Sequence, residues 1–137
     1  SQLDALIIPG GAGAIKNLTN YALTSGDCKI NLQTRDLILQ LIEENKPVGA
    51  ICIAPLVVAK ALATTKYRPR LTVGCECPQS EYIEEELGAL HIEKAVDEIA
   101  VDDELKLVTT PAYMLGESIA DVDAGIAALV GKVVDLS

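Results

Sequence analysis

The segment around Cys52 brings together a buried strand, a thiol and the start of a helix. Residues 48–53 form an apolar run, and Ala54-Pro55 begins a helix with proline in its first turn. A strand that delivers a nucleophile into the first turn of a helix is the layout of a nucleophile elbow. The exposed N–H groups and positive dipole end of the helix stabilise a thiolate, the reactive form of cysteine. The pattern therefore indicates Cys52 as a catalytic nucleophile, with a buried structural thiol as the alternative.

A second feature, Pro9-Gly10-Gly11, offers the hydrogen-bond donors that such a nucleophile needs. It follows the apolar run 3–8, which we expect to be a neighbouring buried strand. Glycine lets backbone N–H groups approach a substrate without an intervening Cβ. We expect Gly10 and Gly11 to line the substrate site, and the N–H groups of Gly11 and Ile53 to bind the oxyanion. The alternative is that the two glycines make only a tight turn. Neither common glycine-rich phosphate motif occurs, so phosphate binding is not predicted.

The elements that must position these residues alternate along the chain. Apolar runs predict strands at residues 3–8, 48–53, 71–73 and 90–92 and a hairpin over 98–101 and 105–109. Helical periodicity predicts helices at 34–44, 54–62 and 81–87 and from 112 onward, after a polar, turn-rich stretch at 17–27. Such alternation predicts an α/β fold with a mostly parallel sheet, in which we expect strands 48–53 and 71–73 to be neighbours.

Composition limits the class of protein. A chain of 137 residues, 50% apolar and 23% charged, predicts one domain with its own core. The formal net charge of −9 repels phosphate backbones and anionic lipid, so we expect neither nucleic acid nor a membrane as a partner. Four cysteines without a signal segment favour a reducing compartment, and we expect a cytoplasmic protein.

Three motifs, in order, give a resemblance to a known family. Residues 9–20 (PGGAGAIKNLTN), 52–55 (CIAP) and 108–114 (VTTPAYM) resemble the ElbB family, also called enhancing lycopene biosynthesis or glyoxalase-like proteins. That family lies in the class I glutamine amidotransferase-like, PfpI-type superfamily. The resemblance implies a flavodoxin-like three-layer sandwich, with residues 1–137 as the C-terminal portion of one such domain and the first βα units missing. It also implies cofactor-independent conversion of small dicarbonyls such as glyoxal and methylglyoxal to hydroxy acids, with Cys52 as nucleophile and a small aldehyde as the binding partner.

The sequence also departs from that family. The resemblance places the acidic residue that should contact the cysteine sulfur in the N-terminal region, before the first residue here. Without it, Cys52 still forms a hemithioacetal but lacks a general base. The alternative function is therefore a thiol-based stress or redox sensor, associated with isoprenoid biosynthesis, that does not turn over substrate. A third interpretation is a degenerate scaffold. A truncated sheet also exposes an apolar edge, which favours a homo-oligomer.

The remaining candidate groups receive structural interpretations. The single histidine, in His91-Ile92-Glu93, has the order of the base and acid of true glutamine amidotransferases, but it comes too early in the chain. We therefore expect a structural histidine and no glutaminase activity. Cys75-Glu76-Cys77 offers two thiols beside only the distant Cys28 and His91, so we predict no metal site. Its loop is expected to border the Cys52 pocket, where a redox role is the minor alternative. The acidic run 84–86 is interpreted as a solvated helix face.

Overall fold

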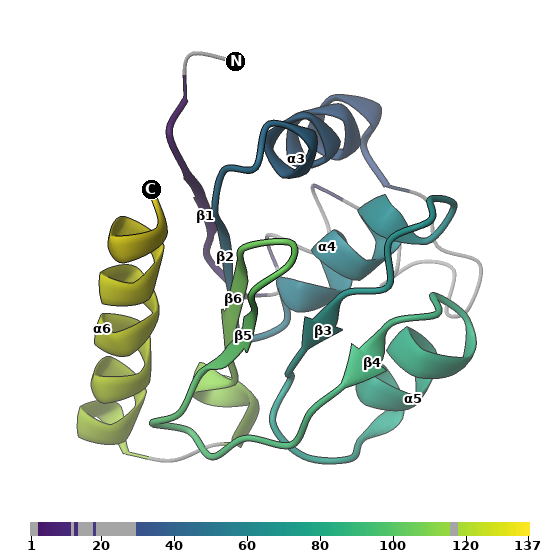
Figure 1. Ribbon diagram of the computed structural model, residues 1–137. Coiled ribbons are helices and arrows are strands. Elements are labelled where there is room, and N and C mark those ends of the chain that lie inside the picture. Colours follow the sequence, from purple (N-terminus) through teal and green to yellow (C-terminus); the bar gives the residue numbers. More distant parts are fainter. Residues whose placement is uncertain (1–2, 12, 14–17, 19–29, 116–117) are drawn as a thin grey trace.

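Strands and helices alternate in the computed structural model, which describes residues 3–11, 13, 18, 30–115 and 118–137 (Figure 1). The described elements are, in chain order, β1 (Leu6–Ile8), α3 (Leu32–Glu43), β2 (Val48–Ile51), α4 (Pro55–Leu62), β3 (Arg70–Leu71), α5 (Pro78–Glu85), β4 (Leu90–His91), β5 (Ala100–Asp102), β6 (Leu107–Thr110), the 3₁₀ helix η1 (Ala112–Leu115) and α6 (Ile119–Leu136). Most of the first motif after Gly11, the turn-rich stretch 17–27 except Leu18, and Cys28 lie outside the described residues.

The main sheet places the ends of three strands at one edge. Its order is β1-β2-β6-β5, with β1 and β6 both parallel to β2 and with β5 antiparallel to β6. The mostly parallel sheet and the hairpin are therefore as predicted. Because parallel strands end at the same edge, the residues after Ile8, Ile51 and Thr110 come together there. This edge carries the candidate site.

Helices cover both faces of the main sheet, which confirms the three-layer sandwich. Successive residues of a strand point to opposite faces. Helices α3 and α4 lie on one side of the sheet and α6 lies on the other (Figure 1). In β6, Leu107 belongs to the core cluster that includes residues of α3 and α4, whereas Val108 packs with Leu129 and Val133 of α6. The close packing of α6 depends on Gly49 in β2, where an added Cβ would lie 2.9 Å from the Leu129 Cδ2 atom and 3.0 Å from Val133 Cγ2.

The position of β3 differs from the prediction. We expected it beside β2, but β6 occupies that place, and β3 pairs in parallel with β4 in a separate two-stranded sheet. Side chains rather than a backbone ladder join this small sheet to the hairpin. The Arg70 N–H donates to Asp102 Oδ2 at 2.9 Å, and the Thr72 N–H donates to Thr109 Oγ1 at 3.0 Å. The apolar pattern of residues 71–73 predicted correctly that they are buried, but it did not predict which strand β3 pairs with.

Two helix boundaries also differ from the prediction. The final helical region is divided into η1 and α6, because Ser118 starts a new helix by accepting from the Asp121 N–H at 3.3 Å. Helix α5 begins earlier than residue 81, at Pro78, because Cys77 and Ser80 form a capping box. No helix in the described part of the chain has the length and apolarity that a membrane span requires.

Candidate functional site

Cys52 occupies a tight turn between β2 and α4. Its φ is 64°, a left-handed conformation that costs a residue other than glycine about 1–3 kcal/mol. Two hydrogen bonds hold the turn: the Cys52 N–H donates to the Thr110 carbonyl at 2.9 Å, and the Ala54 N–H donates to the Ile51 carbonyl at 3.0 Å. Strained backbone of this kind persists where the surrounding structure imposes it, often at functional sites. The turn has the backbone form that the elbow prediction requires.

The diglycine segment lies directly against this turn. A Cβ added to Gly10 would overlap the Cβ of Cys52, would lie 2.7 Å from the Ile51 carbonyl oxygen and would lie 3.3 Å from the Cys52 sulfur. Any residue larger than glycine would push the two segments apart. Gly11 has a φ of 101°, which strongly favours glycine. The structure thus brings Gly10, Gly11 and Cys52 together, as the sequence pattern indicated.

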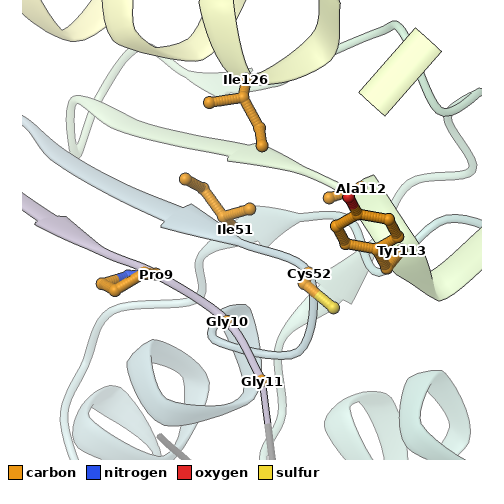
Figure 2. A pocket seen from close by; sticks show the side chains of 8 residues that line it. All are labelled: Pro9, Gly10, Gly11, Ile51, Cys52, Ala112, Tyr113 and Ile126. Atoms are coloured by element: carbon orange, nitrogen blue, oxygen red, sulfur yellow. The ribbon is translucent and has the colours of Figure 1, made fainter. Parts of the chain in front are cut away.

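These residues line a cavity of about 300 Å³ at the edge of the main sheet (Figure 2). The lining residues are Pro9, Gly10, Gly11, Ile51, Cys52, Ala112, Tyr113 and Ile126. The Cys52 side chain is half-buried, so the sulfur is not sealed inside the core. The volume lies at the lower end of the range of about 300–1,000 Å³ found for small-molecule sites.

Ala112, Tyr113 and Ile126 also line the cavity, and none of them was assigned a role in the site from the sequence. Ala112 is 1% exposed and has a φ of 46°, which makes it a second strained residue at the cavity. Tyr113 follows it, is 61% exposed and stands across Cys52 from Gly11 in Figure 2. Ala112 and Tyr113 both belong to the third sequence motif. They reach the cavity because β6, which precedes them, pairs in parallel with β2, and the sequence did not predict that pairing. Ile126 belongs to α6, and its helical periodicity gave no sign that it reaches the site.

Ile53 directly follows Cys52 in the turn between β2 and α4. Its side chain packs against the main core and does not line the cavity. None of the hydrogen bonds between described residues uses the N–H group of Gly11 or that of Ile53. The assignment of both amides to the oxyanion site stays a prediction.

His91 lies away from the cavity and has a structural contact. Its Nε2 atom accepts from the Val73 N–H at 3.1 Å, which requires that nitrogen to be unprotonated. Burial lowers the pKa of His91 below its ordinary value of 6.5, although Glu84, Glu93 and Glu76 oppose this shift. The expected structural histidine fits this contact. Within the described ranges, no carboxylate or imidazole lines the cavity.

The paired thiols Cys75 and Cys77 also lie elsewhere. Cys75 is exposed and Cys77 caps helix α5, and neither lines the described cavity. The expectation that this loop borders the Cys52 pocket is therefore wrong, because β6 rather than β3 lies beside β2. The described residues contain no cluster of histidine, cysteine or acidic side chains that is arranged to hold a metal ion.

The fold of this chain is shared by solved structures of other proteins. The crystal structure of an isoprenoid biosynthesis protein with an amidotransferase-like domain from Ehrlichia chaffeensis superposes with a TM-score of 0.86 and 27% identity, covering 98% of this chain and 60% of that one. Drosophila melanogaster DJ-1beta has the same fold, with a TM-score of 0.60, 18% identity, and coverage of 98% of this chain and 62% of that one. The flavodoxin-like α/β architecture is thereby confirmed.

Comparison of the sequence with curated proteins identifies relatives in animals. The human "Glutamine amidotransferase-like class 1 domain-containing protein 3, mitochondrial" is 39% identical over 98% of this chain and 52% of its own length. The rat "ES1 protein homolog, mitochondrial" is 38% identical with the same coverage. No family model matches the chain. Its homologues are thus glutamine amidotransferase-like class 1 domain proteins, and the chain spans about half the length of these curated relatives.

The comparisons overturn the predicted location. The names of the human, rat and zebrafish relatives all state a mitochondrial location, which contradicts the expectation of a cytoplasmic protein. Free cysteines argue only against an oxidising compartment, so they do not distinguish one reducing compartment from another.

Proposed function

We propose that this chain carries the nucleophile of a glyoxalase-like enzyme of the ElbB type, which converts small dicarbonyls to hydroxy acids without a cofactor. The observation that supports this proposal is the strained Cys52, which faces a cavity bordered by Gly10 and Gly11. A half-buried thiol at a strand-to-helix turn, next to backbone amides, suits addition to a carbonyl.

The proposed reaction begins with addition of the Cys52 thiolate to the aldehyde carbon. A C–S bond forms, and the carbonyl electron pair moves to oxygen, which accepts hydrogen bonds from the N–H groups of Gly11 and Ile53 before it is protonated. A base then removes the remaining hydrogen of that carbon as a proton, and a proton is added to the neighbouring ketone carbon. The aldehyde carbon is thereby oxidised to a thioester and the ketone carbon is reduced to an alcohol. Water cleaves the thioester, releasing the hydroxy acid and the thiol.

The proton transfer between the two carbons is the proposed slow step. We propose that water or a dissolved base carries the proton, since the described lining residues include no carboxylate or imidazole. Formation of D-lactate from methylglyoxal should therefore rise in proportion to added imidazole at constant pH. A rate that does not respond to imidazole would show that the chain itself supplies the base.

The direct test compares D-lactate production by the unmodified chain, Cys52→Ser and Cys75→Ser. Cys75 is an exposed thiol outside the cavity and serves as the matched control. We expect production to be lost in Cys52→Ser and kept in Cys75→Ser. Equal production in the unmodified chain and Cys52→Ser, with or without imidazole, contradicts the proposal.

The lack of a base among the described lining residues favours a second candidate function, a thiol-based redox sensor. In that role the Cys52 sulfur attacks one oxygen of hydrogen peroxide and the O–O bond breaks, so that the sulfur is oxidised to a sulfenic acid and the other oxygen leaves as water. Mass spectrometry should then find one added oxygen on Cys52 before any on the exposed Cys75. D-lactate production that depends on Cys52 would contradict a sensor without turnover.

A further inference from the structure

The cavity beside Cys52 has two different sides. The Gly10–Gly11 segment presents backbone against the sulfur, whereas Ile51, Ala112 and Ile126 form an apolar wall. Figure 2 shows Ile51 and Ile126 on the same side of Cys52, away from the glycines. Ile51, Cys52 and Ile126 all pack against one cluster built on Val96, Ala112 and Val122, so this wall is continuous with a small core.

We infer that this site takes dicarbonyls with an uncharged, apolar side group larger than a methyl, and that Ile126 selects them. This inference rests on the proposed function, in which the glycine side holds the reacting carbonyl and leaves the opposite wall for the rest of the substrate. Ile126 comes from α6, whereas the reacting groups come from the ends of β1 and β2. In this inference the helix α6 selects the substrate through Ile126, whereas residues at the ends of β1 and β2 carry out the reaction.

The size of the cavity supports an additional side group. An engineered apolar cavity of about 150 Å³ is large enough to bind benzene. The present cavity, at about 300 Å³, has roughly twice that volume and still includes the sulfur and the glycine amides on its wall. A dicarbonyl with only a methyl group leaves the Ile126 side of this space unfilled. A ring or a branched alkyl group occupies it and is removed from water.

The charge distribution supports a neutral side group. Apart from the Cys52 thiol, which the proposed reaction uses as a thiolate, the described lining residues include no acidic or basic side chain, so none of them pairs with a charged side group. A charge placed against isoleucine loses its hydration without compensation. The net charge of −9 adds a long-range repulsion for anions. A neutral apolar group meets neither penalty.

The test uses alkylation of Cys52, which probes the cavity without turnover. The sulfur displaces iodide from three reagents that share the same reacting carbon: iodoacetamide, N-phenyl-iodoacetamide and iodoacetate. Peptide mapping gives the rate at Cys52 relative to exposed Cys75, which corrects for intrinsic reagent reactivity. We expect this ratio to be about tenfold higher for the phenyl reagent than for iodoacetamide, and lower for iodoacetate, since filling an apolar pocket contributes factors of about 10–200.

Substitutions at Ile126 assign the effect to the wall. Ile126→Ala should reduce the phenyl preference several-fold, and Ile126→Lys should raise the relative rate with iodoacetate. The matched control is Val130→Lys, which adds the same charge one turn further along α6 at a residue that is 39% exposed and outside the cavity. Ile126 is itself half-buried, and Leu129 and Val133 anchor α6 independently. Thermal unfolding of each variant verifies folding.

The outcomes separate this inference from the proposed function. Equal Cys52 to Cys75 ratios for the three reagents, or a phenyl preference unchanged in both Ile126 variants, overturn the inference even if methylglyoxal yields D-lactate. A phenyl preference that depends on Ile126, without the corresponding hydroxy acid from any dicarbonyl, supports the site and overturns the catalytic proposal.

Discussion

Gly10→Ala is the substitution that most directly tests the geometry of the site. The added Cβ would overlap the Cys52 Cβ and lie 2.7 Å from the Ile51 carbonyl oxygen. Both contacts involve the backbone or the first side-chain atom, so rotation of a side chain cannot relieve them. Overpacking typically costs about 1–3 kcal/mol, and we expect the upper part of that range. A displacement of about 1 Å between the nucleophile and the amides should also reduce turnover about 10²-fold.

Two assays measure these effects. Urea denaturation gives the change in the free energy of unfolding, and D-lactate production gives the change in turnover. The control is Gly131→Ala, at an exposed position of α6 where an added Cβ meets nothing within 4 Å. That variant should be stabilised by about 0.5–1 kcal/mol, because alanine favours a helix. If Gly10→Ala matched the unmodified chain in stability and in alkylation of Cys52, the diglycine segment would not lie against the elbow.

The remaining predictions concern packing and pH. Gly125→Ala should destabilise the fold by about 1–3 kcal/mol, although Gly125 lies in a helix. The added Cβ would overlap the Val96 carbonyl oxygen and lie 2.9 Å from Thr110 Oγ1. A gain in the free energy of unfolding would refute this contact. Leu129→Ala should cost about 2–5 kcal/mol, since Leu129 is 0% exposed between α6 and the sheet; a smaller loss by urea denaturation would contradict that packing. Burial lowers the pKa of His91 in the folded chain below 6.5, so the unfolded chain binds a proton at His91 more tightly. The contribution of His91 to stability is therefore complete above pH 6.5 and is lost as the pH falls. His91→Asn should weaken this pH dependence of the free energy of unfolding, measured by urea denaturation at a series of pH values.

Local patterns in the sequence were enough to predict the fold class and the strand-to-helix turn that carries Cys52. Apolar runs of strand length and helical stripes report which residues become buried, and they predicted β2, α4 and the hairpin. The position of Cys52 between a strand and a proline-started helix is also a local property. The diglycine turn was also identified from local sequence, because glycine has no Cβ and allows the backbone to approach a neighbouring segment closely.

Tertiary structure decided which of these elements meet. Periodicity shows that a strand is buried but not which strand it pairs with, because pairing depends on packing between residues far apart in the chain. The parallel pairing of β2 with β6, rather than with β3, brought Ala112 and Tyr113 to Cys52, and neither Cys75 nor Cys77 is among the described lining residues. Likewise, only the docking of α6 on the sheet placed Ile126 at the cavity. Cys52 could therefore be proposed as the nucleophile from its neighbours in the chain, whereas the cavity walls around it come from long-range contacts.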